Sequence, residues 1–305
     1  MKIKTNAIVL ILVLGAAPAV RAKLKVAATV PDLAAIARAV AGTRAEVYSL
    51  TLPTQDPHFV DARPHLALKL NRADLLLVVG LGLESGWLPT LLTGARNPRI
   101  RRGAAGYLDC SSVARLREVP RARVDRSRGD VHPGGNPHYL ADPENAGRVA
   151  RAVAARLRRR DPAGAKVYAA NAARFVKSLQ AARLRWAAAL KPYRGTTVVP
   201  YHRSWVYFTG AMGLREVAYL EPKPGIPPNA AHVLRVIRTI RARKVPIMLQ
   251  EEYYPDRTAK LISTKTGARL LIMPGGARLQ KGETYIQRMT VMINTLLAAL
   301  RRARR

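Results

Sequence analysis

The sequence has almost no cysteine and few aromatic residues. Cys110 is its single cysteine, which excludes an intrachain disulfide framework and any cysteine-rich zinc finger. Aromatic residues make up only 6% of the chain. No apolar run of about 18 residues follows the N-terminal segment, so a polytopic membrane protein is excluded as well.

Acidic residues are also scarce beside basic ones. The chain has 52 Lys and Arg against 19 Asp and Glu, a formal net charge of +33 with neutral histidines. Such a surface can bind nucleic acid or an anionic membrane face, or it can simply be solvated. The basic residues are spread along the chain apart from small clusters at 156–160 and 301–305, and no nucleic-acid-binding motif accompanies them. We therefore interpret the excess of positive charge as a solvated surface, and we expect no nucleic-acid partner.

The length and the N-terminus indicate an exported protein of two lobes. At 305 residues and 49% hydrophobic content, the chain exceeds one typical domain and can build real cores. Residues 1–22 are typical of a signal peptide, with Lys2 and Lys4 before a short apolar run and small residues near Ala22. The alternative is an uncleaved N-terminal anchor, although the run is short for a membrane span. In either case we expect a periplasmic or other extracytoplasmic location.

Short apolar runs that are typical of strands alternate with helical patterns. In the first half, strands are expected at 24–30, 45–50 and 74–80, with a helix at 31–41. In the second half, strands are expected at 196–201, 216–220, 246–250 and 269–273, and helices at 233–240, 259–266 and 285–301. The run at 74–80 is nearly all apolar, as in a parallel strand that is buried on both faces. The pattern predicts the α/β class, with a parallel sheet in each of two lobes.

A long helix is expected between the lobes. Asp142-Pro143 and Asp161-Pro162 each place an N-cap residue before a proline at the first helical position. No proline follows until Pro192, so the second helix would be about 43 Å long, which suits a rigid linker. We divide the chain into a signal peptide (1–22), an N-terminal α/β lobe (23–160), a linker helix (161–192) and a C-terminal α/β lobe (193–305).

Three of the six histidines lie in loops at the ends of predicted strands or helices. They are His58, His138 and His202, and the first two follow a proline and precede an aromatic residue. Ligand sites of α/β folds lie in such loops. Neutral imidazoles that converge from separate loops suit a divalent cation such as zinc. Any one of them alone would more often be a hydrogen-bonded structural residue, so the hypothesis depends on the combination.

The motifs around these histidines resemble one protein family. They read QDPHF (55–59), GGNPHY (134–139) and YHRSWVYF (201–208), and further similar stretches lie at 221–228 and 250–251. Over residues 23–300 the chain resembles the periplasmic metal-binding proteins of ABC transporters, the class specific for zinc and manganese. The resemblance implies two α/β lobes joined by a long rigid helix, with a metal ion between them held by His58, His138 and His202. It also implies delivery of that ion to a membrane permease.

The sequence departs from the family pattern in two places. Many members have an aspartate ligand in the loop after the last strand, but residues 273–278 (MPGGAR) contain no acid. Glu251, at the end of a predicted strand, is the candidate for the fourth ligand, followed by Glu252 and a water molecule. Glu251 could equally orient a histidine without touching the metal. The histidine-rich loop of many zinc-specific members is also missing, because residues 115–130 contain no histidine.

The remaining histidines are weaker candidates. His132 could be an auxiliary ligand, although a loop hydrogen bond is the favoured interpretation. His65 and His232 lie in helix-like contexts and are interpreted as structural or surface residues.

Three classes of function fit parts of the sequence. A metal carrier is favoured, with Zn²⁺ preferred over Mn²⁺ because three imidazoles suit zinc, whereas manganese prefers oxygen ligands. A zinc hydrolase with a three-histidine site is the alternative, but the sequence has no HExxH motif. A basic nucleic-acid-binding or adhesin-like surface protein is the third class, and the export signal argues against it. We expect a monomeric binding protein and not an enzyme.

Overall fold

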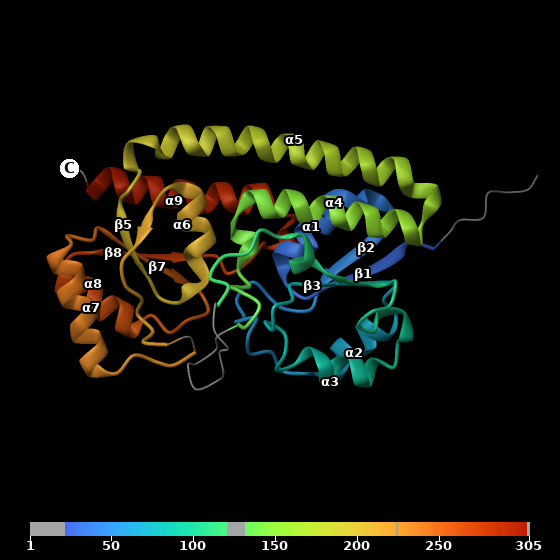
Figure 1. The fold of residues 1–305 in the computed structure, drawn as a ribbon, viewed down its shortest axis with the longest axis horizontal. Coiled ribbons are helices and arrows are strands. Elements are labelled where there is room, and N and C mark those ends of the chain that lie inside the picture. The colour runs from blue at the N-terminus through green and yellow to red at the C-terminus, as the bar shows by residue number, and fades with distance from the viewer. Residues whose placement is uncertain (1–21, 121–131, 224, 304–305) are drawn as a thin grey trace, which may run out of the picture.

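The computed structural model describes residues 22–120, 132–223 and 225–303. Residues 1–21 of the predicted signal peptide lie outside these ranges. Two lobes stand side by side, and long helices run along one side of both (Figure 1). None of the described helices combines the length and the apolarity that a bilayer crossing requires.

The N-terminal lobe is built on a parallel sheet of order β2–β1–β3–β4. The strands are β1 (Leu24–Ala28), β2 (Ala45–Ser49), β3 (Leu75–Val78) and β4 (Tyr107–Asp109), and the helices beside them are α1 (Pro31–Ala41), α2 (Pro64–Asn71) and α3 (Leu88–Ala95). Val26 lies opposite both Val47 and Leu75 in the register. All four residues of β3 are buried. Alternate residues of this strand therefore serve two cores, one shared with α1 and the other with α2 and α3.

The C-terminal lobe repeats this plan with a parallel sheet of order β6–β5–β7–β8. Its strands are β5 (Thr197–Pro200), β6 (Arg215–Glu216), β7 (Ile247–Glu251) and β8 (Arg269–Met273), and its helices are α6 (Val206–Met212), α7 (Ala230–Ala242), α8 (Arg257–Thr266) and α9 (Tyr285–Ala303). Met248 packs with α7 and α8, whereas Ile247 and Leu249 join the core that contains α6 and α9. Both faces of this sheet are therefore covered by helices.

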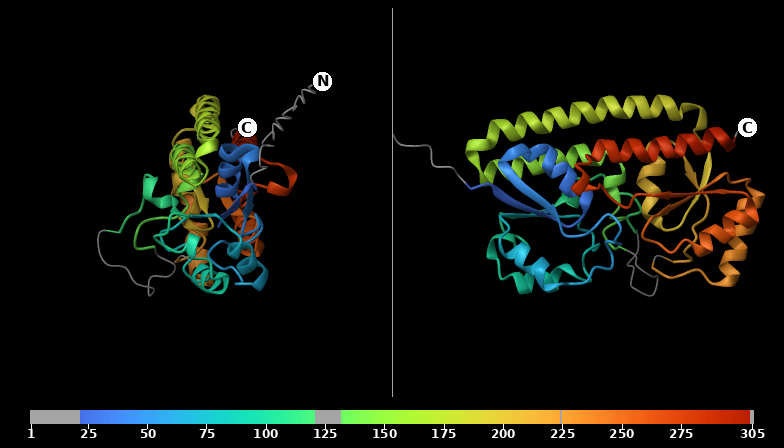
Figure 2. Two further views of the ribbon diagram at one scale, coloured as in Figure 1. Left: turned by 90° about the vertical axis from the view of Figure 1, so that its right-hand side faces the viewer. Right: turned by 180° about the vertical axis from the view of Figure 1, so that it is seen from behind.

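Helices α4 (Pro143–Arg160) and α5 (Ala165–Leu190) connect the two lobes. The Asp142 carboxylate accepts a hydrogen bond from the Glu144 N–H group, which caps α4 as the sequence predicts. With 26 residues, α5 is about 39 Å long and lies along both lobes (Figure 1 and the right view of Figure 2). The buried residues of α5 recur every three or four positions along one face: Tyr168, Ala172, Phe175, Leu179, Ala182, Trp186 and Leu190.

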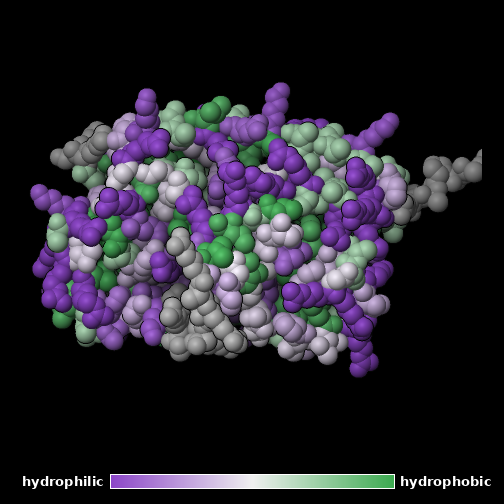
Figure 3. Space-filling model, in the orientation of Figure 1, coloured by the Kyte–Doolittle hydropathy of each residue, from purple (hydrophilic) through white to green (hydrophobic). Residues whose placement is uncertain are grey.

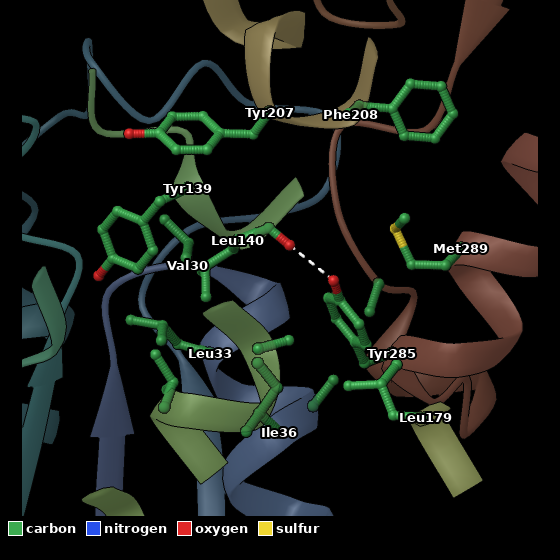
Figure 4. Packing of buried hydrophobic residues seen from close by; sticks show 14 of the residues in the cluster. Val30, Leu33, Ile36, Tyr139, Leu140, Leu179, Tyr207, Phe208, Tyr285 and Met289 are labelled. Atoms are coloured by element: carbon green, nitrogen blue, oxygen red, sulfur yellow. Dashed lines mark hydrogen bonds between the residues drawn. The ribbon is translucent and has the colours of Figure 1, made fainter. Parts of the chain in front are cut away.

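One hydrophobic cluster joins α5 to both lobes. It contains residues of α1 and α4 on the N-terminal side and of α6 and α9 on the C-terminal side. Within it, the hydroxyl of Tyr285 at the start of α9 donates a hydrogen bond of 2.7 Å to the carbonyl oxygen of Leu140 (Figure 4). The lobes therefore share an apolar core in addition to the covalent link.

The predicted fold class is confirmed, and several elements differ in detail from the sequence-based boundaries. The linker α-helix begins at Ala165 because Pro162–Gly164 forms a 3₁₀ turn. The strand expected at 216–220 is only two residues long, at Arg215–Glu216. Helices α3 and α6 and strand β4 were not predicted, and α2 was indicated only by the helix-like context of His65. The domain boundaries at residues 160 and 192 stay a prediction.

Candidate metal centre

The structure brings the three predicted imidazoles together. The candidate ligand atoms of His58, His138 and His202 all lie within 4.8 Å of one another. The ring centroids are 5.1 Å apart for His58 and His138, 5.3 Å for His58 and His202, and 5.4 Å for His138 and His202. A tetrahedral zinc ion with Zn–N bonds of about 2 Å would hold the centroids of its imidazole ligands about 5 Å apart. The spacing therefore fits a single metal ion.

Two of these histidines are held by the same local structure. In Asp56-Pro57-His58, the aspartate Oδ1 accepts a hydrogen bond from the backbone N–H group of His58 at 3.0 Å. In Asn136-Pro137-His138, the asparagine Oδ1 accepts one from the backbone N–H group of His138, also at 3.0 Å. Asp and Asn side chains commonly close turns with the backbone two residues further on. The repeated Asx-Pro-His sequence thus has a structural reason.

His202 reaches the centre from the other lobe. It lies two residues after the end of strand β5, at the carboxyl end of the C-terminal parallel sheet, where open α/β sheets bind ligands. Asn136 connects the two lobes at the metal centre, because its amide donates a hydrogen bond of 2.7 Å to the Arg203 carbonyl oxygen.

Carboxylates hold the second ring nitrogen of two histidines. His58 Nδ1 is 2.7 Å from Asp56 Oδ1, and His202 Nδ1 is 2.6 Å from Glu221 Oε2. An ionised carboxylate only accepts, so Nδ1 carries the proton and Nε2 presents a lone pair. Metal-binding histidines are commonly oriented in this way. In the described part of the chain, Nε2 of His58 is buried without a hydrogen-bond partner, and so is Nε2 of His138.

The surroundings shift the pKa values of the centre in different directions. Burial lowers the pKa of His138 well below its usual value, and the neighbouring imidazoles lower it further. Burial also acts to lower the pKa of His202, but the hydrogen bond and charge of Glu221 outweigh it, so this pKa is raised. Burial acts to raise the pKa of Asp56, and the hydrogen bond from His58 reverses this, so it is lowered. His138 is therefore held neutral, as a metal ligand must be.

Glu251 lies at the end of β7 and is 6% exposed. Its Oε1 accepts a hydrogen bond from the Ser204 hydroxyl, and its Oε2 is buried with no hydrogen-bond partner among the described residues. Burial raises the pKa of this carboxyl. Glu251 lines a cavity of about 90 Å³ together with His138 and Ser204, although it is not one of the residues whose ligand atoms share the 4.8 Å group.

Glu252 is engaged elsewhere. Its Oε2 pairs with Arg278 at 2.8 Å, and its Oε1 accepts a hydrogen bond from the Gly275 N–H group. The carboxylate thereby holds the loop after β8. Of the two neighbouring glutamates, Glu251 is thus the one with an oxygen available in the cavity beside His138.

The loop after β8 has no room for an acidic side chain at Gly275. A Cβ atom there would overlap with the Pro53 carbonyl oxygen and the Tyr253 ring, and one at Gly276 would lie 3.0 Å from the Pro31 ring. The loop packs directly on the N-terminal lobe, where the Ala277 N–H group donates to Asp32 at 3.1 Å. The lack of an acid in residues 273–278 therefore matches a tight contact between the lobes.

The other histidines occupy three different environments. His132 makes the predicted loop hydrogen bond, with Nδ1 3.0 Å from the Leu81 carbonyl oxygen, but its ring also lies 5.5 Å from that of His58. His65 is exposed on α2, and His232 on α7 contacts the Tyr219 carbonyl oxygen through Nε2 at 3.0 Å. His65 and His232 thus match their interpretation as surface or structural residues.

Sequence reasoning did not single out Asp56 and Glu221 as partners of the histidines. The signal for Asp56 is present in the Asp56-Pro57-His58 motif. Glu221 is 19 positions from His202, and no spacing rule connects the two. Both residues line a cavity of about 310 Å³ that reaches the centre, with Phe59 and Tyr254 in its wall.

The sequence matches the family described as the periplasmic component A of the zinc-uptake complex, ZnuA, over residues 26–299. The chain belongs to this family. It is 30% identical over 270 residues to the high-affinity zinc uptake system protein ZnuA of Paracoccus denitrificans, covering 77% of this chain and 78% of that protein. It is 28% identical over 284 residues to the iron-binding protein YfeA of Yersinia pestis, covering 90% and 85%.

Solved structures of similar proteins share the fold. A crystal structure of ZnuA has a TM-score of 0.74 at 19% identity, covering 91% of this chain and 99% of that one. FpvC from Pseudomonas aeruginosa in complex with Mn²⁺ has a TM-score of 0.77 at 21% identity, covering 92% and 100%. Members of the ZnuA family are periplasmic metal-binding components of ABC transporters that capture a metal ion for delivery to a permease. They are not enzymes, which removes the hydrolase alternative.

Proposed function

We propose that this ZnuA-family protein captures Zn²⁺, with His58, His138 and His202 as ligands, and delivers it to its permease. The main support for the proposal is the convergence of three imidazoles, two buried and that of His138 half-buried, whose ligand atoms lie within 4.8 Å of one another. Nitrogen ligands favour zinc over manganese, which prefers oxygen donors.

Glu251 is proposed as the carboxylate of the site. Its buried Oε2 has no hydrogen-bond partner in the described residues, and it shares a cavity with His138. A buried carboxyl is stabilised as an anion by a nearby cation. Zinc would therefore lower the pKa of Glu251 from its raised value, and the carboxylate would offset part of the charge of the ion.

The test is a zinc and manganese titration of the protein and of His138→Ala, with elemental analysis of the purified protein. We expect one zinc ion per chain, weaker binding of manganese, and a loss of zinc affinity of roughly 100-fold or more in the variant, because losing even an outer partner of a ligand costs 10–100-fold. His65→Ala is the control, because His65 is exposed on α2. Unchanged zinc affinity in His138→Ala would contradict the proposal.

We propose export by residues 1–22, action outside the cytoplasm as a monomer, and no nucleic-acid partner. On the face shown in Figure 3, hydrophilic side chains are spread over both lobes, which supports a solvated surface there. The mass of the exported protein should correspond to a chain that begins at Lys23, and size-exclusion chromatography should give one chain per particle.

A further inference from the structure

We infer that His132 provides a fourth imidazole to the metal site through its Nε2 atom. The inference depends on the proposed role of His58, His138 and His202 and adds one ligand to theirs. His132 lies beside this group, with its ring centroid 5.5 Å from that of His58. This separation is close to the 5.1–5.4 Å that separate the other three rings. The ligand atoms of His132 are outside the set of three histidines whose ligand atoms lie within 4.8 Å of one another, so metal binding has to draw the His132 ring inward.

The hydrogen bond of His132 fixes which ring nitrogen can bind a metal. Its Nδ1 lies 3.0 Å from the Leu81 carbonyl oxygen. A carbonyl oxygen only accepts, so Nδ1 must carry the proton and Nε2 the lone pair. His58 and His202 have the same arrangement with carboxylates as acceptors. A metal-binding histidine commonly donates its other N–H group to a carboxylate or a backbone carbonyl, and His132 fits this description.

Glycines hold His132 in this position. The segment from His132 to Gly135 is a turn closed by a hydrogen bond of 3.1 Å from the Gly135 N–H group to the His132 carbonyl oxygen. A Cβ atom at Gly134 would lie only 2.8 Å from the Leu81 side chain, and Gly135 has φ of +114°, which favours glycine. The turn can therefore lie against Leu81, whose carbonyl oxygen orients His132.

A fourth imidazole accounts for a site without an acid in the loop after β8. Residues 273–278 contain no acid and Gly275 has no space for a side chain, so a fourth ligand supplied by the chain has to come from elsewhere. With His132 as the fourth ligand, Glu251 contributes its charge without occupying a coordination position. Four nitrogen ligands would also strengthen the preference for zinc over manganese.

The test compares His132→Asn with His65→Asn as a matched control. Asparagine can still donate a hydrogen bond to the Leu81 carbonyl oxygen, but it lacks the Nε2 atom. We expect zinc affinity to fall about tenfold in His132→Asn and to stay unchanged in His65→Asn. X-ray absorption at the zinc edge should count four imidazoles in the original protein and three in His132→Asn, and the melting temperatures of the metal-free proteins should agree.

Two outcomes separate this inference from the proposed function. If His138→Ala loses zinc affinity while His132→Asn keeps it, and the original protein shows three imidazoles, then only the role of His132 is wrong. If His138→Ala itself keeps full zinc affinity, the proposed function fails and the inference fails with it.

Discussion

Asp32, near the start of α1, forms a buried ion pair with Arg288 of α9. Arg288 Nη1 donates to Asp32 Oδ2 at 2.7 Å, and the two side chains are 8% and 11% exposed, respectively. Asp32 also accepts the Ala277 N–H group, and Arg288 donates to the Pro274 carbonyl oxygen at 2.8 Å. The pair therefore connects a helix of the N-terminal lobe to the C-terminal loop that packs beside the metal centre.

Breaking this pair should destabilise the protein strongly. We expect Arg288→Met to lower the free energy of unfolding by roughly 3–5 kcal/mol, because it leaves a buried carboxylate without its partner. Chemical denaturation of the metal-free protein measures this effect. Arg63→Met is the control, because the Arg63–Asp61 pair is 66% and 75% exposed, and its loss should change the free energy by less than about 1 kcal/mol. Equal effects of the two substitutions would show that the interlobe pair adds no stability.

Glu221 should affect zinc binding without touching the metal. Its hydrogen bond fixes the proton of His202 on Nδ1, so we expect Glu221→Ala to lower zinc affinity by about 10–100-fold. Isothermal titration with zinc is the measurement. Glu46→Ala removes an exposed acid on β2 and the same charge, and it should leave the affinity unchanged. A similar loss in both variants would mean that the effect arises from net charge alone.

Gly275 should not tolerate a side chain. Gly275→Ala would place a methyl group against the Pro53 carbonyl oxygen and the Tyr253 ring, and we expect a loss of about 1–3 kcal/mol from overpacking. Gly94→Ala is the matched control, because Gly94 lies in α3 and its added Cβ would meet Ala67 at an ordinary 3.4 Å. Thermal denaturation should show a lower melting temperature for the first variant only. A fully stable Gly275→Ala protein would disprove the close contact.

Glu84 should make stability depend on pH. It is 4% exposed and accepts hydrogen bonds from Thr29, Val79 and Gly80. Burial raises its pKa from 4.5 to about 7. Between pH 4.5 and about 7, the Glu84 carboxyl therefore stays protonated in the folded protein but is ionised in the unfolded chain. The contribution to stability is fully present below pH 4.5 and is lost as the pH rises to about 7.

The size of this effect can be measured by substitution. A shift of this size corresponds to roughly 3 kcal/mol. Glu84→Gln cannot ionise, so its unfolding free energy should fall less than that of the original protein between pH 4.5 and 7. Urea denaturation in a metal chelator across this range gives the comparison. Parallel pH profiles for the two proteins would assign the pH dependence to other groups.

The sequence could predict elements whose signals are local. Strand β8 lies at Arg269–Met273, as predicted, because a short apolar run between turn signals is typical of a strand. The Pro-His-aromatic motifs predicted ligand loops from the sequence, and the structure adds that an Asx turn closes each loop within three residues. Strand β4 escaped prediction because three residues are too few for a periodic pattern.

Most of the features that the sequence could not predict depend on long-range contacts. Glu221 meets His202 only through the folded C-terminal lobe, and the Leu81 carbonyl oxygen meets His132 across 51 positions. The contact of Gly275 with Pro53 joins residues of different lobes. None of these contacts follows from a local pattern, so the candidate ligands were predictable while their long-range partners were not.

The position of α5 along both lobes has a consequence for how the cargo leaves. A helix that buries Tyr168 at one end and Leu190 at the other in a single apolar cluster opposes any wide swing of one half of the molecule away from the other. Unloading should then proceed through small movements of a few ligand loops at the mouth of the cavity. The permease would then release the ion by contacting and moving these loops, and the rate of transfer would depend on the flexibility of the loops.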